Sequence, residues 1–186
     1  MLNRGVRMRI WIVIVAAAVL VLVAGGCAST RRSSPPPATV PFVDLERYAG
    51  LWYQVARYPH SFQRRECRLS TARYTLRDDG RVTVRNDCWV DEVDGKRAQT
   101  VGAVARPHNE SNSWLKVSFF GIFPADYLII ELDPEYEWAV VTTPNRNTLW
   151  ILAREPRLEE DLYTRIVDRL VDRGFVREKI IRTSLQ

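Results

Sequence analysis

The sequence contains few of the residues that bind metals or build disulfide networks. Its 186 residues include three cysteines and two histidines. Three cysteines are too few for a disulfide-dense scaffold or for a four-cysteine zinc site. The two histidines exclude a multi-histidine metal site, and both His60 and His108 fall in predicted loops, where a surface position is the usual one. We therefore expect neither a metal site nor a cofactor.

The sequence also lacks the motifs of common enzymes. It has no Gly-x-Ser-x-Gly nucleophile elbow, no phosphate-binding loop and no His-Glu-x-x-His metal motif. A catalytic acid would need a shifted pKa, and Glu131, on an apolar predicted strand, is only a weak candidate. Glu131 could equally face a helix or solvent. The chain is not expected to be an enzyme.

The apolar run near the N-terminus is short for a membrane span. Residues 10–24 carry no charge, whereas a spanning helix needs about 20 apolar residues. Arg4, Arg7 and Arg9 precede this run, and small residues lead from it to Cys27. Residues 1–26 are therefore predicted to be a secretory signal. A free Cys27 beside an uncleaved anchor is the alternative.

The residues before Cys27 resemble the lipobox of bacterial lipoproteins, although Ala24 stands where that family more often has leucine. The resemblance implies cleavage before Cys27, a lipid on its thiol and acylation of the new amino group. Ala28 follows in place of the aspartate that usually retains such proteins, which implies the outer membrane, facing the periplasm. Residues 27–41, rich in serine and proline, are predicted to form an extended tether.

The basic charge of the chain does not belong to its folded part. The formal net charge of +5 would suggest nucleic acid or an anionic membrane as a partner. Five arginines lie before Val40 and no acidic residue does, which leaves 22 basic and 22 acidic side chains from Val40 onward. The predicted domain, residues 42–186, is formally neutral. Nucleic acid is therefore not an expected partner.

From residue 42 onward, short apolar segments alternate with turn signals. The Asp79-Gly80 pair is a strong hairpin signal, and Asp94-Gly95 marks a further turn. Regular short strands with tight turns predict an antiparallel sandwich or a closed barrel. The predicted strands are residues 51–57, 69–77, 81–90, 98–105, 114–120, 126–132, 136–142 and 148–154.

The chain is predicted to end in a helix that covers one side of the sheet. Leucine, isoleucine and valine recur at helical spacing between Leu158 and Val171. Pro156 suits a first helical position, and Gly174 suits a stop. Predicted strands such as residues 138–141 are apolar on both faces, which indicates that a second layer packs on one of them.

Three segments resemble the sequence motifs of the lipocalin family. The first includes Gly50 and Trp52, the second runs over residues 132–140 with Asp133 and Tyr136, and the third ends at Arg154. The second motif lacks the Thr-Asp-Tyr of many members. The resemblance extends over about residues 42–181. It points to the outer-membrane bacterial branch, which is related to plant temperature-induced lipocalins and apolipoprotein D.

The resemblance implies an all-β fold, an eight-stranded antiparallel up-and-down β-barrel with a C-terminal α-helix packed outside. In the family, Trp52 would close the barrel floor and Arg154 would pack over it. The ligand implied by the branch is a fatty acid or lysophospholipid, held for lipid storage, transport or membrane maintenance under envelope stress. Eight strands leave an interior just wide enough for one small ligand.

Alternation along the strands identifies candidate ligand-binding side chains on the interior face. Ordinary barrel packing is at least as common a role for each of them, and the interior faces of the sixth and seventh strands are the hardest to assign. The candidates are Ala72, Tyr74, Val84, Leu115, Val117, Phe119, Tyr127, Trp150 and Leu152.

Cys67 and Cys88 are predicted to form a disulfide. Secretion would place them in an oxidising compartment, and a hairpin folded at Asp79-Gly80 would bring them close together. Two buried thiols are the alternative. Closing a loop of about twenty residues would stabilise the fold by about 3 kcal/mol.

Lipid binding is the main hypothesis, and two others remain open. A lipocalin-type enzyme would act on a hydrophobic substrate through a buried acid or thiol. An envelope interaction module or homodimer would use the apolar segment 119–124, whose rings could instead fold over the barrel mouth.

Overall fold

A computed structural model describes residues 35–60, 67–90, 95, 97–119, 121 and 123–183. The predicted signal, Cys27 and the first part of the predicted tether lie outside the described residues. No helix in the described part of the chain is long and apolar enough to cross a membrane.

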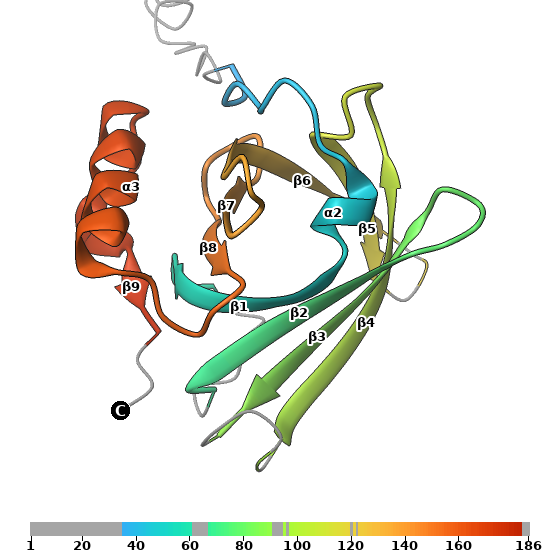
Figure 1. Ribbon diagram of the computed structural model, residues 1–186, viewed down its shortest axis with the longest axis horizontal. Coiled ribbons are helices and arrows are strands. Elements are labelled where there is room, and N and C mark those ends of the chain that lie inside the picture. Colours follow the sequence, from blue (N-terminus) through green and yellow to red (C-terminus); the bar gives the residue numbers. More distant parts are fainter. Residues whose placement is uncertain are drawn as a thin grey trace, which may run out of the picture. The chain divides into compact units, whose positions relative to one another are not determined.

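The described chain forms a closed antiparallel barrel with a helix outside it (Figure 1). Strands β1 to β8 pair in chain order, and β8 also pairs with β1, which closes the barrel. This confirms the predicted eight-stranded up-and-down architecture. The strands are β1 (Gly50–Arg57), β2 (Leu69–Leu76), β3 (Val82–Trp89), β4 (Arg97–Pro107), β5 (Trp114–Phe119), β6 (Phe123–Leu132), β7 (Trp138–Thr142) and β8 (Leu149–Ala153).

The strand boundaries differ from the predicted ones where turns intervene. β7 begins at Trp138 and not at residue 136, because Tyr136 has a positive φ of 64° in the turn between β6 and β7. The side chain of Asp133 holds this turn by accepting hydrogen bonds from the backbone amides of Glu135 (3.0 Å) and Glu137 (3.3 Å). β6 begins three residues before its predicted start, at Phe123.

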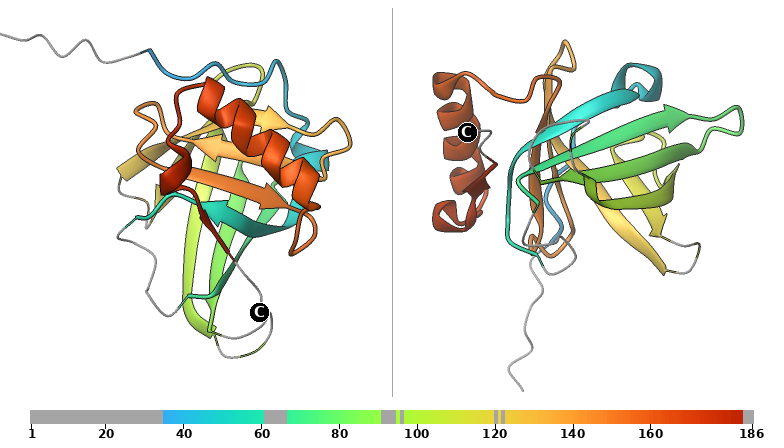
Figure 2. Two further views of the ribbon diagram at one scale, coloured as in Figure 1. Left: turned by 90° about the vertical axis from the view of Figure 1, so that its left-hand side faces the viewer. Right: turned by 90° about the horizontal axis from the view of Figure 1, so that it is seen from below.

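Helix α3 (Glu160–Asp172) packs on the outer face of the barrel, as the sequence predicts (Figure 2). It begins four residues after Pro156, because the chain first lays the partly buried Leu158 against the barrel. Acidic residues in its first turn favour the positive helix end. Gly174, with φ of 84°, ends it as predicted. A 3₁₀ turn, η1 (Arg177–Lys179), then leads to the short strand β9 (Ile181–Arg182), which pairs with β1.

Two hydrophobic clusters share the strands of the barrel. The inner cluster fills the barrel and contains Trp52, Tyr74 and Val84. The outer cluster lies between four strands, β1, β6, β7 and β8, and the apolar stripe of α3. This stripe includes Ile166 and Leu170. The later strands are apolar on both faces because they serve both clusters.

Residues 35–41, assigned to the tether from composition, lie against the barrel. The backbone amide of Val40 donates to the carbonyl of Ile129 (3.0 Å), and Val40 packs on the inner cluster. The Arg173 and Arg146 side chains donate to the carbonyls of Ala38 (2.6 Å) and Pro35 (3.0 Å). A four-residue helix, α2 (Leu45–Tyr48), follows, because Asp44 caps its backbone amides.

Candidate functional site

The barrel has a closed end and an end formed by longer connections. The closed end, called the floor, is where α2, the turn between β6 and β7, and the end of β8 meet. At the other end, called the rim, β1 ends at Arg57, and residues 143–148 connect β7 to β8. A ligand that enters the interior would pass the rim.

Trp52 and Arg154 close the floor. Trp52 is fully buried and its indole Nε1 donates to the carbonyl of Tyr48 (2.8 Å). The Arg154 guanidinium carbon lies 3.9 Å from the centre of the Trp52 ring, which is a cation–π contact. Gly50 allows this approach: its φ is 102°, and an added Cβ would lie 3.1 Å from Nη1 of Arg154.

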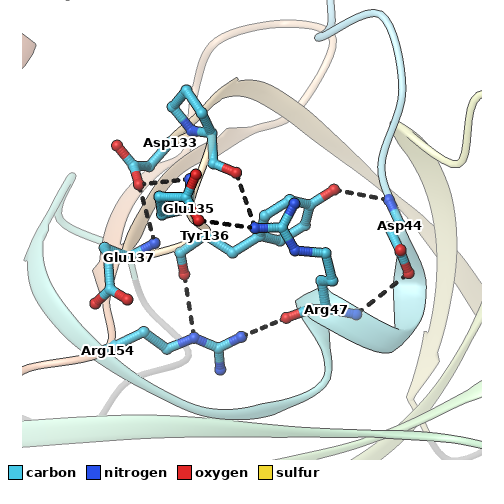
Figure 3. Close-up of polar contacts among 8 residues, drawn as sticks. Asp44, Arg47, Asp133, Glu135, Tyr136, Glu137 and Arg154 are labelled. Carbon is cyan, nitrogen blue, oxygen red and sulfur yellow. Dashed lines mark hydrogen bonds and ion pairs between the residues drawn. The ribbon is translucent and has the colours of Figure 1, made fainter.

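Arg154 also ties three segments of the floor together (Figure 3). Its Nε donates to the carbonyl of Tyr136 (3.2 Å) and its Nη1 to that of Leu51 (2.9 Å). Its Nη2 donates to the carbonyls of Arg47 (2.7 Å) and Ala49 (3.0 Å). The hydrogen-bonding capacity of the guanidinium is therefore used within the floor, which indicates a structural role.

A second layer of contacts surrounds the floor (Figure 3). The hydroxyl of Tyr136 accepts a hydrogen bond from the backbone amide of Asp44 (2.9 Å), and Arg47 lies over the Tyr136 ring at 4.2 Å. Arg47 also donates to the carbonyl of Pro134 (3.0 Å). These contacts join α2 to the turn held by Asp133, so the first and second motifs pack against each other.

All nine candidate lining residues lie on the inner side of the barrel. Each belongs to the inner cluster or packs on it, on β2, β3, β5, β6 or β8. The structure also shows which faces of β6 and β7 point inward, which the alternating pattern did not settle. Tyr127 and Ile129 of β6 and Ala139 and Val141 of β7 are on the inner side. That these side chains contact a ligand remains a prediction.

Three tyrosines form a polar group inside the barrel, next to the floor. The hydroxyl of Tyr127 is 2.7 Å from that of Tyr48 and 2.9 Å from that of Tyr74. Burial raises the pKa of Tyr74 to about 12, and it raises the pKa values of Tyr48 and Tyr127 as well. All three phenols are therefore neutral at physiological pH. The three hydroxyl groups have three hydrogens, and the two hydrogen bonds among them use two of these. One O–H therefore remains as a donor for another acceptor.

A basic residue, Arg57, lies on the inner side near the rim. A β-bulge after Gln54 shifts the register of β1, so that Arg57 pairs with Trp150 of β8, which packs on the inner cluster. The ring of His60 lies 5.6 Å from that of Trp150. Burial and the charge of Arg57 lower the pKa of His60 to about 4, so His60 is neutral at pH 7.

Sequence reasoning missed part of this arrangement. It did not name Tyr48 as a lining residue, because Tyr48 precedes the first predicted strand. It did not name Arg57, because a bulge leaves no mark in an alternating pattern. His60 was assigned to the surface, but it is only partly exposed and packs near Trp150. The other histidine, His108, is exposed as expected.

A disulfide joins Cys67 to Cys88, as predicted, across a sequence separation of 21 residues. It connects the segment before β2 to the end of β3, on the rim side of the barrel. Of the apolar segment 119–124, Phe120 and Ile122 lie outside the described residues, so a role in dimer formation stays a prediction.

The weak candidate for a catalytic acid, Glu131, faces the helix. A bulge in β6 places Glu131 opposite Val140, on the outer side, where its carboxylate accepts from Arg169 (3.0 Å) and lies 3.6 Å from Arg173. Its role is to hold α3 on the barrel. Among the residues that the structure describes, no three histidine, cysteine or acidic side chains are grouped to hold a metal ion.

Comparison with known proteins agrees with this geometry. A family model described as a lipocalin-like domain matches residues 43–185. Outer membrane lipoprotein Blc of Vibrio cholerae is 36% identical over 144 residues, which cover 77% of this chain and 83% of that protein. Temperature-induced lipocalin-1 of Arabidopsis thaliana is 34% identical over 149 residues, which cover 76% and 78%.

The fold is shared with solved structures of much lower sequence identity. Insecticyanin from the tobacco hornworm Manduca sexta superimposes with a TM-score of 0.62 at 16% identity, covering 82% of this chain and 86% of that one. The family match extends over most of the barrel and α3, and it includes Trp52 and Arg154 of the floor. The chain therefore belongs to the lipocalin family.

Proposed function

We propose that this lipocalin is an outer-membrane lipoprotein, facing the periplasm, whose barrel holds one single-chain amphipathic lipid. A fatty acid or lysophospholipid is the ligand class, and lipid storage, transport or membrane maintenance under envelope stress is the role. Support for the location comes from relatives that are named outer membrane lipoproteins and from the residues around Cys27.

The apolar inner face carries the ligand proposal. Val84, Leu115, Val117 and Leu152 are buried on the inner side, and the floor beneath them is closed by Trp52. Such a lining binds hydrocarbon through apolar burial, at about 0.8 kcal/mol for each buried CH₂ group. A chain of sixteen carbons could thus be held without any covalent step.

Charge on the strands supports an anionic headgroup near the rim. Three acidic residues lie on β1 to β8, namely Asp87, Asp126 and Glu131. They pair with Thr71, Lys116 and Val140, which are outward-facing positions, so all three acidic residues are on the outer side of the barrel. Arg57 shares the inward register of Trp150 and has no acidic partner within 4 Å in the described part of the chain. A carboxylate or phosphate at the rim would meet a positive charge.

Displacement of a lipid-like fluorophore tests the proposal. A soluble form that begins at Ala28 should bind the fluorophore, and palmitate or palmitoyl-lysophosphatidylcholine should displace it. Two neighbours in β3 provide a matched pair of variants, since Val84 is buried inside and Thr83 is exposed outside. Val84→Phe should weaken lipid binding at least about tenfold, and Thr83→Phe should leave it unchanged. Failure of every single-chain lipid to displace the fluorophore would refute the proposal.

The attachment of residues 35–41 bears on how the barrel meets the membrane. The carbonyl of Pro35 is held by Arg146, in the connection between β7 and β8 at the rim. Pro35 is eight positions after Cys27, and eight residue steps of fully extended chain span at most about 29 Å. A lipid on Cys27 would therefore hold Pro35 within about 29 Å of the membrane surface, and we expect the rim, to which Pro35 is bonded, to lie nearer that surface than the floor does.

Fluorescence quenching in vesicles tests this orientation. A fluorophore at an introduced cysteine would be placed either at exposed Asn145, beside the rim, or at exposed Asp78, in the turn between β2 and β3. A quencher attached to lipid headgroups should quench the label at position 145 more strongly in the lipidated protein. Equal quenching at the two positions would contradict the orientation.

A further inference from the structure

Gln54 is a buried polar side chain inside the barrel. It follows Trp52 by two residues on β1, so both side chains lie on the inner face. Its partner across the strand pair is Leu152 of the inner cluster, and Gln54 is only 7% exposed. The amide of Gln54 therefore lies beside Leu152, one of the apolar candidate lining residues.

The amide nitrogen of Gln54 has no hydrogen-bond partner. Its Nε2 is buried and carries two hydrogens, neither of which is donated to an atom of the described chain. The other buried polar side chains, Thr71, Ser113 and Thr142, all form hydrogen bonds. Buried donors in native proteins are nearly always paired, so an unpaired one indicates that something else supplies the acceptor.

We propose that Gln54 is a specificity-determining residue that donates a hydrogen bond from Nε2 to an uncharged oxygen of the bound lipid. This inference rests on the proposed lipid-binding function and refines it. A carboxylate or phosphate at this depth would be desolvated without a neighbouring cation. An ester carbonyl or hydroxyl oxygen needs only a donor, and the amide provides one.

The position of Arg57 indicates which oxygen is recognised. Arg57 lies on the same inner face and nearer the rim, and its partner Trp150 is two residues from Leu152, the partner of Gln54; two residues span about 7 Å along a strand. A headgroup phosphate near Arg57 would leave the acyl ester carbonyl of a lysophospholipid within reach of Gln54. A free fatty acid has no oxygen beyond its carboxylate. Gln54 would therefore favour ester-linked single-chain lipids.

A pair of lipids that differ only in the carbonyl tests the inference. The probes are 1-palmitoyl-lysophosphatidylcholine and its 1-O-hexadecyl ether analogue, each used to displace the fluorophore from the soluble protein. The wild type should bind the ester about 2- to 12-fold more tightly, which corresponds to one hydrogen bond. Gln54→Met, which keeps the volume but removes the donor, should bind both lipids equally.

Stability without lipid gives an independent readout. Removing an unpaired buried amide should raise the melting temperature of the lipid-free protein, by about 2–8 °C. Thr142→Val is the matched control, because Thr142 is also buried but donates to the carbonyl of Thr148 (2.6 Å) on the outer side. That variant should melt at a lower temperature and keep the preference for the ester. Gln54→Leu repeats the test if the methionine variant packs poorly.

Three outcomes would overturn the role of Gln54 and leave the proposed lipid-binding function standing. The wild type could bind ester and ether equally, or Gln54→Met could keep the preference for the ester. Both Gln54 variants could also melt at a lower temperature, which would mean that the amide stabilises the lipid-free fold. If neither lipid displaces the fluorophore from the wild type, the proposed function itself fails, and the role of Gln54 fails with it.

Discussion

Replacing Arg154 by alanine should destabilise the barrel without changing its choice of ligand. The guanidinium lies over the Trp52 ring and donates to four backbone carbonyls from β1, the segment around α2 and the turn before β7. It is half-buried and lies at the floor, where four of its five N–H donors are used. The variant removes contacts that join segments far apart in the sequence.

The expected loss follows from these contacts. A cation–π contact contributes about 0.5–2 kcal/mol. A buried carbonyl left without a donor costs about 1–3 kcal/mol, while the exposed carbonyl of Arg47 can bind water instead. The free energy of unfolding should therefore fall by about 2–5 kcal/mol. The stability of Arg154→Lys should lie between those of Arg154→Ala and the wild type, because an ammonium keeps the charge and three donors but cannot reproduce the planar fork that reaches all four carbonyls.

Urea unfolding followed by circular dichroism measures this loss, and Arg47→Ala provides the control. Arg47 also lies over an aromatic ring, that of Tyr136 at 4.2 Å, but it is exposed and its contact with Glu135 is on the surface. Its removal should cost less than about 1 kcal/mol. If Arg154→Ala unfolds within about 0.5 kcal/mol of the wild type and instead loses lipid binding, the structural role assigned to Arg154 is wrong.

Three further predictions concern the rim, the tyrosines and the helix. Replacing Cys67 and Cys88 by serine should lower the free energy of unfolding by about 3 kcal/mol, measured in urea, because the unfolded chain gains freedom; an unchanged midpoint would contradict this. Burial raises the pKa of Tyr74 to about 12 from its ordinary value of 10. The neutral phenol therefore contributes its full stability below pH 10, and this contribution is lost between pH 10 and 12. Tyr74→Phe should reduce the loss of stability over this pH range in urea titrations, and a pH dependence identical to that of the wild type would refute the prediction. Glu131→Gln should speed hydrogen exchange in α3 while lipid affinity stays the same, since Glu131 pairs with Arg169 on the outer side; weaker lipid binding with unchanged exchange would place Glu131 in the ligand site instead.

Much of the fold could be predicted from the sequence because two simple periodicities are nearly unbroken in it. Alternation along β2, β3 and β5 places Tyr74, Val84 and Val117 inside the barrel, where the structure also has them. The helical stripe of α3 packs on strands that are apolar on both faces. The disulfide followed from the hairpin that brings β2 and β3 together.

The parts that could not be predicted depend on contacts between distant segments. Residues 35–41 read as a solvated tether from their prolines, but backbone and arginine hydrogen bonds with the barrel hold them in place. Tyr48 enters the interior from α2, and only the folded chain brings it to Tyr127 and Tyr74. No local pattern carries such information.

Two β-bulges explain the remaining differences, and together they sort charge across the barrel wall. In β1 the bulge after Gln54 puts Val55 and Ala56 in the outer cluster and brings Arg57 to the inner side. In β6 the bulge after Ile129 puts Ile130 in the outer cluster and Glu131 opposite Val140, although strict alternation would have turned the carboxylate inward.

The consequence of the two bulges is an inner side near the rim that has a basic residue and no acidic strand residue, which supports the proposed anionic headgroup. One bulge adds a positive charge to the inner side near the rim, and the other removes a negative charge from it and pairs that charge with Arg169 of α3. A bound carboxylate or phosphate would therefore meet attraction from Arg57 and no repulsion from Glu131. Because the same bulge in β6 also anchors the helix, the shift of one residue in register serves both the stability of the fold and the charge of the proposed binding site.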